Sequence, residues 1–578
     1  MKTRVNKIGI FVFLVLGLVL LQSCQASDTP EPAQPTDPPA QTQPTTAPDE
    51  PPPVEEDTVV IIGSFAESPN LNPYYLSGPE AASFMIVEGL LTISVDGTYI
   101  ANLITEVPSL ENGGLSADGL VITYKLIDGL VWSDGEPVTS ADIRFTWEAV
   151  INPNNAVVKT LGHEKIVSVD TPDDLTAIAT LGEPYVAYLT FFPALLPEHV
   201  LAGLDSMDNA DYNRAPVGTG PYQVVEWVSG SHIELEPNPN YRKAGLPQID
   251  SVFVKWLPSR EAGLAQLVTG EIDVLEDITV AELEGLEGNS DLRIVSLPSL
   301  ASERLFLNLS DESDPAVPHP ILGDLMVRQA IDFAVDREAL INGLLDGRAT
   351  RATSDLPSGQ FGDSTIQPTD FDPDASRALL DEAGWVLGDD GIRSKDGIRM
   401  ALRVSTASGN QLRELTEQLL QEMFADVGIE LSIENKESGT FWGAYADGGI
   451  RFVGDFDILL YTTGPGVTGS FVDPHAHMVG YYHSANIPYE ATDFSGGNYM
   501  RFASDIVDAA LDEAGSVPDV AARQAAYSRA MNAIADEKPV LFLYNRVQIH
   551  VFNASIQGSA DNTWLAQIPS WDIENWTK

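Results

Sequence analysis

Cysteine and basic residues are scarce in this 578-residue sequence. Cys24 is the only cysteine, so no disulfide within the chain is available and packing must supply the stability. Lysine and arginine number 32 against 84 aspartates and glutamates, which gives a formal net charge of −52. A body of this charge does not attract nucleic acid or an anionic lipid surface. We therefore expect no nucleic-acid partner.

Signatures of enzyme chemistry are absent as well. The sequence has no Gly-x-Ser-x-Gly elbow, no Walker-type loop and no His-Glu-x-x-His pair. Cys24 is the one possible nucleophilic thiol, and the Pro-rich acidic tract beside it offers neither a base nor a shaped pocket. Carboxylates are too numerous for counting to exclude a glycosidase pair. We expect no enzyme and no cofactor, with a secreted hydrolase as the alternative from another class.

A long apolar stretch occurs only near the N-terminus, over residues 8–21. Three basic residues precede it and a small serine follows it, which is the layout of a secretory signal. As a helix this stretch rises about 21 Å, short of the roughly 30 Å hydrocarbon core of a bilayer. A permanent transmembrane anchor is therefore the weaker interpretation, and we predict a signal peptide over residues 1–23.

The end of that stretch, Leu21-Gln22-Ser23-Cys24, resembles the bacterial lipobox, in which cleavage leaves a lipid-modified N-terminal cysteine. We predict lipidation of Cys24; an ordinary signal peptide with a chance cysteine is the alternative. Residues 24–57 are dominated by Pro, Thr, Gln, Asp and Glu and have almost nothing to bury. Such a segment cannot offset its ordering entropy, so we predict a lipid-anchored, disordered linker there.

From residue 58 onward the pattern is that of a mixed α/β globular protein. Residues 58–65 form an apolar run of strand length, typical of a strand covered on both faces. Ser140 is expected to cap a helix that ends before Asn152 and Pro153. Residues 401–434 have the pattern of a strand, a helix and a second strand, which indicates a parallel pair with a crossover helix.

The crossover helix within residues 401–434 has a regular apolar spacing. Leu412, Leu415, Leu419 and Met423 recur at helical intervals and are expected to form one apolar stripe. Gly428 follows where a C-terminal cap belongs. The helix is therefore expected to end shortly before that glycine.

Four further segments carry motifs in a fixed order. They are "YKLIDGLVWSDGEPVTSADIRFTWEAV", "APVGTGPYQVVEWVSGSHIELEPNPNY", "LFLNLS" with "VRQAIDFAVDREALINGLLDGRA", and "FDPDASRALLDEAGW". Together they resemble the solute-binding component of peptide-type ABC importers. That family contains oligopeptide-, dipeptide- and nickel-binding proteins and also oligosaccharide binders, and the resemblance runs from about residue 58 to the C-terminus.

The resemblance implies a two-lobed, periplasmic-binding-protein-like class II fold of the α/β class, with an extra subdomain in the first lobe. The expected divisions are lobe I over residues 58–300 with its extra subdomain at about 89–214, lobe II over 301–545, and a C-terminal tail over 546–578 that returns to lobe I. Residues 302–310 and 539–550 are expected to be the two strands that cross between the lobes.

The function that the resemblance implies is a receptor that captures peptides between its lobes and delivers them to an ABC permease. The protein is expected to be a monomer outside the cytoplasm, held to the cell membrane by the lipid on Cys24. The same role for oligosaccharides or a metal chelate is the alternative, as is a sensor-type binding module without a permease.

Ligand contacts are carried over from the family onto matching positions. They are Ser77, Gly78, Pro79, Trp442, Tyr461 and Tyr544. Peptide binders place an aspartate just after the aromatic-ended strand, where it pairs with the free amine of the peptide. Here Gly464 stands near that place, and Asp473 is the next acid. Either the loop brings Asp473 back or the ligand has no free amine, which favours cargo such as oligosaccharides that stack on aromatic faces.

Two histidines follow Asp473 in the sequence. If residues 471–478 were extended, His475 and His477 would point the same way and could share a transition metal or hold a metal chelate. We favour an ordinary loop without a resident metal.

Overall fold

The computed structural model describes residues 58–76, 81–158, 160–311, 314, 316–465, 473–559, 561–565 and 567–578. The predicted signal peptide, Cys24 and the linker fall outside the described residues, as do the predicted ligand contacts Ser77, Gly78 and Pro79. Within the described ranges, the structure has no helix long and apolar enough to cross a membrane.

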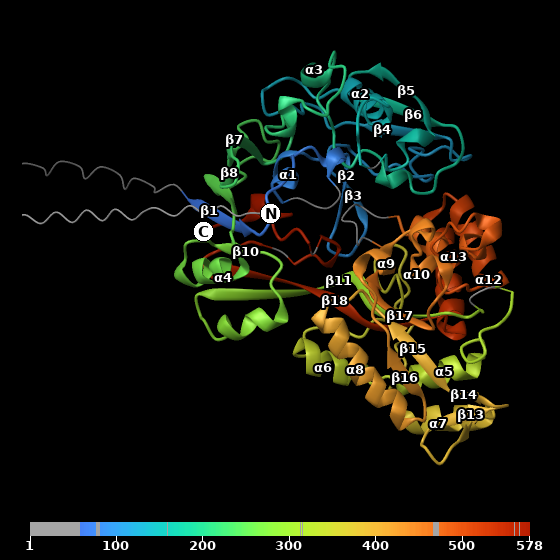
Figure 1. The fold of residues 1–578 in the computed structure, drawn as a ribbon. Helices are drawn as coiled ribbons and strands as arrows, with labels where there is room; N and C mark the ends of the chain where they lie inside the picture. The colour runs from blue at the N-terminus through green and yellow to red at the C-terminus, as the bar shows by residue number, and fades with distance from the viewer. Residues whose placement is uncertain are drawn as a thin grey trace, which may run out of the picture. The chain divides into compact units, whose positions relative to one another are not determined.

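A ten-stranded mixed sheet runs through the fold (Figure 1). Its strand order is β16-β15-β17-β11-β18-β10-β1-β9-β8-β7. Its strands are β1 (Val59–Ser64), β7 (Tyr222–Val228), β8 (His232–Pro237), β9 (Ser251–Trp256), β10 (Val274–Leu275), β11 (Leu292–Leu307), β15 (Ala401–Ser405), β16 (Glu430–Ile433), β17 (Ile458–Thr463) and β18 (Val540–Asn553).

The long strands β11 and β18 connect the two halves of this sheet. They pair antiparallel, with register shifts between Pro298 and Ser302 and between Glu303 and Arg304. At one end β18 pairs with β10, and at the other β11 pairs with β17 (Figure 1). The two segments predicted to cross between the lobes are therefore strands, and they lie side by side.

Buried side chains gather into two groups on either side of the crossing. We call lobe I the part whose core lies between Val60 and Val295 and between Ile549 and Trp576, and lobe II the part whose core lies between Leu305 and Tyr544. Within lobe I, residues between Leu90 and Leu195 have a core of their own. This extra subdomain contains a three-stranded sheet in the order β4 (Val121–Lys125), β6 (Thr176–Leu181), β5 (Ile166–Asp173).

Helices cover the sheets in both lobes (Figure 1). In lobe I they are α1 (Ala81–Ile86), α2 (Ser140–Ile151), α3 (Glu198–Leu201) and α4 (Arg260–Thr269). In lobe II they are α5 (Leu325–Ala334), α6 (Arg337–Leu345), α7 (Pro373–Glu382), α8 (Gln411–Asp426), α9 (Ser438–Trp442), α10 (Ile450–Val453), α11 (His475–Tyr482), α12 (Asp505–Ser516) and α13 (Val520–Glu537). Short strands complete the fold: β2 (Leu91–Ile93), β3 (Tyr99–Ala101), β12 (Val386–Leu387), β13 (Arg393–Lys395) and β14 (Ile398–Arg399).

Helix α2 has the predicted limits but not the predicted cap. Its N-cap is Thr139, whose N–H donates to a carboxylate oxygen of Asp142 at 2.8 Å. The hydroxyl of Ser140 donates instead to the main-chain oxygen of Asp173 in β5, at 2.6 Å. The prediction that Ser140 caps the helix was wrong by one residue, because two adjacent hydroxyl residues each fit the cap pattern.

Helix α8 follows the predicted strand–helix–strand order, and β15 and β16 are parallel. Of the predicted apolar stripe, Leu412, Leu419 and Met423 are partly buried against the core, and Leu415 is 39% exposed. The buried positions are Arg413, Thr416, Glu417, Leu420 and Phe424. The Nε of Arg413 donates to buried Glu303 of β11 at 2.7 Å, so an ion pair occupies part of the face where apolar packing was expected.

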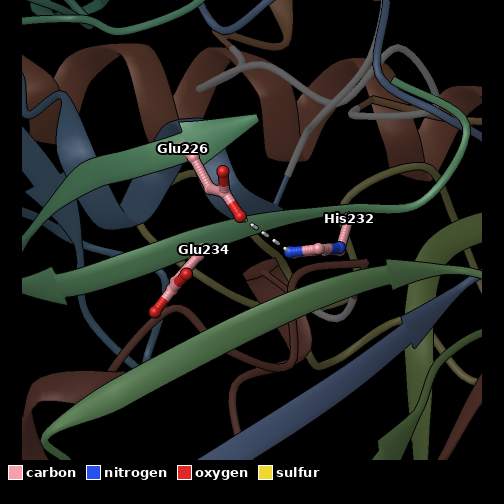
Figure 2. Close-up of side chains that lie close together, drawn as sticks. All are labelled: Glu226, His232 and Glu234. Atoms are coloured by element: carbon pink, nitrogen blue, oxygen red, sulfur yellow. Dashed lines mark ion pairs between the residues drawn. The ribbon is translucent and has the colours of Figure 1, made fainter. Parts of the chain in front are cut away.

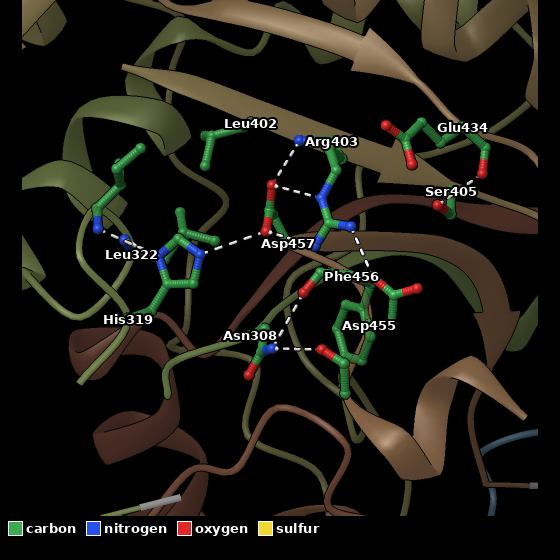
Figure 3. A network of polar contacts seen from close by, with 12 residues as sticks. Asn308, His319, Leu322, Leu402, Arg403, Ser405, Glu434, Asp455, Phe456 and Asp457 are labelled. Carbon is green, nitrogen blue, oxygen red and sulfur yellow. Dashed lines mark hydrogen bonds and ion pairs between the residues drawn. The ribbon is translucent and has the colours of Figure 1, made fainter. Parts of the chain in front are cut away.

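A polar network around Asp457 fixes the start of β17 in lobe II (Figure 3). Asp457 accepts the main-chain N–H of Arg403 at 2.7 Å and a guanidinium N–H of the same residue at 3.2 Å. Nε2 of His319 lies 3.3 Å from the other side of this carboxylate. The side-chain amide of Asn308 donates hydrogen bonds to the main-chain oxygens of Gly454 and Phe456, just before Asp457. Segments distant in the sequence are thereby joined at one carboxylate.

Candidate functional site

An aromatic cluster lies on lobe II where α9 meets β17. Trp442, at the end of α9, is 40% exposed, and its ring meets buried Tyr461 edge to face at 5.5 Å between centroids. Tyr461 in turn stacks on Phe306 of β11 at 4.2 Å. The guanidinium carbon of Arg451 lies 4.8 Å from the centre of the Trp442 ring. Trp442 thus offers an exposed, rigidly supported aromatic surface, whereas Tyr461 serves as its support.

The main chain at Gly464 runs very close to β11. A Cβ atom at this position would lie 2.5 Å from the main-chain oxygen of Leu300. An aspartate in place of Gly464 would therefore need the backbone to shift. The departure from the pattern of peptide binders at this point has a steric cause in the fold.

Asp473, at the far end of the segment that begins after Gly464, is paired within the protein. Its carboxylate accepts hydrogen bonds from Nη2 of Arg523 at 2.8 Å and from the main-chain N–H of His475 at 2.9 Å. The side chain of Asp473 is 8% exposed. This carboxylate is thus already neutralised by a guanidinium group.

Arg523 also connects the two lobes. Its Nη1 donates to the main-chain oxygen of Val186, which belongs to the extra subdomain of lobe I, at 2.9 Å. Its Nη2 donates to Tyr527 in the same helix, α13, at 2.8 Å. Burial disfavours the charged guanidinium, but the Asp473 carboxylate outweighs it, and the pKa of Arg523 lies above its ordinary value.

A pocket between the lobes lies beside this ion pair. From lobe I it is lined by Ile93, Gly97, Tyr99 and Trp564, and from lobe II by Leu356, Ser358, Gln360, Phe361, Pro465 and Pro474. Pro465 follows Gly464 and Pro474 follows Asp473, so the two predicted positions flank one wall. The hydroxyl of Tyr99 is buried and has no hydrogen-bond partner among the described residues. Its burial raises the pKa of Tyr99 far above the usual range, so the hydroxyl is present in its neutral form.

Trp564 fits between glycines of both lobes at this pocket. A Cβ on Gly97 of lobe I would lie 2.1 Å from its indole ring, and a Cβ on Gly359 of lobe II 2.0 Å. The main-chain N–H of Gln360 also reaches the oxygen of Gly97, at 3.5 Å. Besides sharing the crossing strands, the lobes therefore touch through backbone and one large ring.

Tyr544 lies in β18 within the core of lobe II. It is fully buried and pairs with Glu303 across the sheet. Burial, followed by the charge of Glu303, raises the pKa of Tyr544 far above the usual range. Tyr544 thus belongs to the core of lobe II, and its predicted ligand contact stays a prediction.

His475 and His477 lie in helix α11, and so neither in the ordinary loop that was favoured nor in the extended segment that a shared metal would need. Two residues along a helix rotate by about 200°, so the two rings point to different sides. Nδ1 of His475 lies 3.3 Å from the hydroxyl of Tyr527, whereas Nε2 of His477 lies 2.7 Å from a carboxylate oxygen of Asp355. The idea that these two rings share one metal is wrong, because the helix separates them.

His477 belongs to a buried chain of charges that reaches the crossing strand β11. Asp355 accepts from Nη1 of Arg304 at 2.7 Å and from the hydroxyl of Tyr482 at 2.6 Å. Burial alone would raise the pKa of Asp355, but Arg304 and His477 hold it well below its ordinary value. Arg304 also donates to the main-chain oxygen of Thr463 at 2.7 Å. This chain joins the end of β17, at Thr463, to helix α11, at His477.

Tyr99, Trp564 and Arg523 were not predicted from the sequence as residues of this site. Trp564 is 465 residues away from Tyr99 in the sequence (564 − 99 = 465), and no local periodicity connects them. The one available signal was the glycines Gly97 and Gly359, both at positive φ, which mark places where backbone turns tightly or approaches another group.

Comparisons with known proteins agree on one family. Residues 105–489 match the model of the bacterial extracellular solute-binding proteins, family 5. The oligopeptide-binding protein AppA of Bacillus subtilis is 26% identical over 84% of this chain and 86% of its own length. A putative ABC transporter peptide-binding protein of Brucella ovis is 30% identical over 74% of this chain and 78% of its own length.

Solved structures of binding proteins also have this fold. NikZ from Campylobacter jejuni, in complex with Ni(L-His), superposes with a TM-score of 0.66 at 25% identity, covering 90% of this chain and 99% of NikZ. AppA from Bacillus subtilis in complex with a nonapeptide superposes with a TM-score of 0.60 at 24% identity, over 90% of this chain and 99% of AppA. The two-lobed fold with an extra subdomain in lobe I is thus the fold of these binding proteins.

Proposed function

The chain belongs to the bacterial extracellular solute-binding proteins of family 5, and from this membership we propose that it is the substrate-binding receptor of an ABC importer that captures peptides between its lobes. The family consists of binding proteins of transporters, not of enzymes. Peptides are favoured as cargo because the relatives from Bacillus subtilis and Brucella ovis are named for peptide binding.

One observation carries the proposal in this chain. The lobes share a sheet through β11 and β18 and also touch outside those strands, where Arg523 donates to the oxygen of Val186. Opening about the crossing strands breaks only a few such contacts, and a ligand bound to both lobes favours the closed form. A receptor needs this balance, because it must both capture and release its cargo.

The groups available to a ligand favour contacts other than an ion pair with a free amine. Gly464 carries no acid, and Asp473 is engaged by Arg523. Trp442 offers an exposed ring, and Tyr99 offers a buried hydroxyl between the lobes. We propose that the cargo is held by aromatic packing and hydrogen bonds, and that Ser77, Gly78 and Pro79 complete the site from lobe I.

The buried clusters of the two lobes also indicate the domain limits. The core of lobe I resumes after the end of lobe II, at Ile549. We propose the divisions 58–300 with a subdomain at 89–214, then 301–545, and finally 546–578, because the buried clusters separate near those limits.

Native mass spectrometry of gently purified protein, followed by thermal-shift titration with peptide and oligosaccharide libraries and with nickel–histidine, tests the cargo. We expect a retained or added peptide mass and a saturable rise in melting temperature with peptides. Trp442→Ala is expected to weaken that binding at least tenfold, and Phe371→Ala, which removes a ring that is 45% exposed outside the site, to leave it unchanged. A shift with saccharide or nickel–histidine alone would replace the peptide by that cargo, and turnover without a shift would indicate the hydrolase.

We propose further that the mature protein is a monomer anchored outside the cytoplasm by lipid on Cys24. Two or more fatty chains hold a protein stably at a membrane, whereas one gives marginal binding. Labelling cells with a fatty-acid probe should mark the wild-type protein. Cys24→Ser should abolish the label and release the protein to the soluble fraction; continued membrane association would favour an uncleaved apolar anchor.

A further inference from the structure

The edge hairpin of lobe I carries three metal-ligating side chains on one face (Figure 2). Glu226 lies in the edge strand β7, and His232 and Glu234 lie in β8. Glu226 and Glu234 are direct partners across the two strands, and His232, two residues before Glu234, projects to the same face. A register shift after Val224 brings Glu226 into this alignment.

The three side chains lie close enough for one ion. One ligand atom of each lies within 4.8 Å of those of the other two, and the described residues hold no second group of three that is this close. Nε2 of His232 is 3.6 Å from a carboxylate oxygen of Glu226. Ligand atoms around a tetrahedral Zn²⁺ are separated by about 3.3 Å, given bonds of about 2.0–2.1 Å. Small rotamer changes of the two accessible glutamates bring the ligand atoms from their present separations, which are within 4.8 Å, to the separation that a tetrahedral ion needs.

The imidazole of His232 is held as a ligand histidine usually is. The hydroxyl of Ser231 lies 2.9 Å from Nδ1, and the ring packs against Phe253 at 5.4 Å between centroids. When Nδ1–H donates to Ser231, the lone pair of Nε2 faces the two glutamates. A hydrogen bond to the second ring nitrogen fixes tautomer and orientation in metal sites.

The charges around the hairpin also favour a cation. Two glutamates directly opposed across antiparallel strands repel each other, and a cation bound between Glu226 and Glu234 relieves that repulsion. Lys255 of β9 pairs with His232 across the sheet, but its ammonium group donates to Gln266 at 2.9 Å. Lys255 therefore lowers the affinity of this face for a cation without occupying it.

We propose that Glu226, His232 and Glu234, which we call the hairpin site, bind a divalent transition-metal ion such as Zn²⁺. One imidazole nitrogen and two carboxylate oxygens are ligands that Zn²⁺ accepts, with water completing the coordination. All three residues come from a single hairpin, so binding does not require the lobes to close. The site is independent of the cargo proposed above.

Isothermal titration of the untagged, folded protein with ZnCl₂ in excess Mg²⁺ tests the proposal. We expect one Zn²⁺ bound per chain at pH 7.5. His232→Ala and the double variant Glu226→Gln/Glu234→Gln should each weaken binding by more than about tenfold, and Ser231→Ala by about tenfold, as for other residues that orient ligands.

The matched control is Glu236→Gln, on the same face of β8, whose carboxylate is already held by Gln223 at 2.9 Å. This variant should bind Zn²⁺ like the wild type, and all variants should keep the wild-type circular dichroism and melting temperature without metal. Absence of Zn²⁺ binding by the wild type, binding that survives His232→Ala, or an equal loss in Glu236→Gln would each overturn the proposal.

Discussion

Nη1 of Arg523 in lobe II lies 2.9 Å from the main-chain oxygen of Val186 in the extra subdomain of lobe I. The same guanidinium donates from Nη2 to Asp473 and Tyr527, and it lies 4.6 Å from the ring centre of Phe361. These last three residues belong to lobe II and hold Arg523 in place whatever the position of lobe I. We therefore expect the hydrogen bond to Val186 to form as the lobes close and to break as they open.

Arg523→Lys should favour the open form and weaken ligand binding. Lysine keeps a charge opposite Asp473 but cannot reach Val186 at the same time. A hydrogen bond from a charged donor contributes about 1.5–3 kcal/mol, which corresponds to about 10- to 100-fold in affinity. Calorimetry with the identified ligand measures the affinity, and small-angle scattering of the free protein measures closure.

Arg529→Lys is the matched control for this change. Arg529 lies in the same helix, α13, and pairs with Glu513 on the exposed surface, where such pairs contribute little. It should bind ligand like the wild type. An Arg523→Lys protein that is folded and binds with unchanged affinity would show that the contact with Val186 has no part in closure.

The sequence was sufficient for elements whose pattern is local. The apolar run at residues 58–65 forms β1, and Gly428 follows helix α8 at φ +88° as a C-terminal glycine should. The apolar spacing of α8 could not reveal which polar residues share its buried side, because spacing ignores charge pairing. Arg413 and Glu417 are buried there, and Arg413 is paired with a glutamate 110 residues away.

Long-range contacts explain why the site was harder to predict. The family resemblance pointed to Trp442, just before β17, but Tyr99 and Trp564 line one pocket although they are far apart in the sequence. His475 and His477 were expected in a loop, whereas the helix that they start is fixed by Asp355 and by contacts of α11 with α12. No pattern within a short window contains that information.

Gly359→Ala should displace the ring of Trp564 and hinder the meeting of the lobes. The added Cβ would lie 2.0 Å from the indole, and Gly359 has φ +81°. Trp564→Ala alone removes the indole ring that the new Cβ would meet. The double variant should therefore lose little more ligand affinity than Trp564→Ala. The remaining difference is about 1–2 kcal/mol of backbone strain at Gly359. A double-mutant cycle on affinity and on melting temperature measures this coupling. Strict additivity of the two changes would contradict the contact.

Tyr99→Phe separates a ligand contact from a structural role. The hydroxyl of Tyr99 is buried without a partner among the described residues, so its removal should leave the melting temperature of the free protein unchanged or slightly higher. Ligand affinity should fall about tenfold if the cargo bonds to this hydroxyl. Tyr489→Phe, at a ring that is 36% exposed elsewhere on lobe II, is the control. A lower melting temperature with unchanged affinity would assign Tyr99 to packing alone.

Glu417→Gln should stabilise the protein at alkaline pH only. Burial raises the pKa of Glu417 to about 7, against an ordinary value of 4.5. The folded state thus holds this proton more tightly than the unfolded chain, and stability is lost as the pH rises from about 4.5 to about 7. Glutamine retains the hydrogen bond from Asn435, which is 2.8 Å long, so the variant should gain about 2–3 kcal/mol at pH 8 and nothing at pH 4.5.

Urea unfolding at the two pH values measures the effect of Glu417→Gln. Glu422→Gln, on the exposed side of the same helix, should change stability little at either pH. A gain of equal size at pH 4.5 and pH 8 would show that the proton on Glu417 is not its source.

Asp457→Asn should destabilise lobe II, because every group around this carboxylate is a donor (Figure 3). Nδ1 of His319 accepts main-chain N–H groups from Ile321 at 3.1 Å and Leu322 at 2.9 Å, so Nε2 carries the proton and donates to Asp457. Arg403 donates from the other side. An asparagine amide would place an N–H against one of these donors, at a loss of about 2–3 kcal/mol.

The pH dependence of this loss has a definite sign. Burial alone would raise the pKa of Asp457, but the hydrogen bonds from His319 and Arg403 hold it below its ordinary value. A lowered pKa gives stability that is present above the unfolded pKa of about 3.9 and is lost as the pH falls through the folded value. The difference between wild type and Asp457→Asn in denaturant unfolding should thus be full at pH 7 and shrink below about pH 4.

Asp455→Asn is the matched comparison, since Asp455 bonds to the same Arg403 at 2.7 Å but its side chain is 43% exposed. Exposed pairs contribute up to about 1 kcal/mol, so this change should be the smaller of the two at every pH. Equal losses for Asp455→Asn and Asp457→Asn would mean that the charge of Arg403, not the buried donor set around Asp457, controls the stability of this part of lobe II.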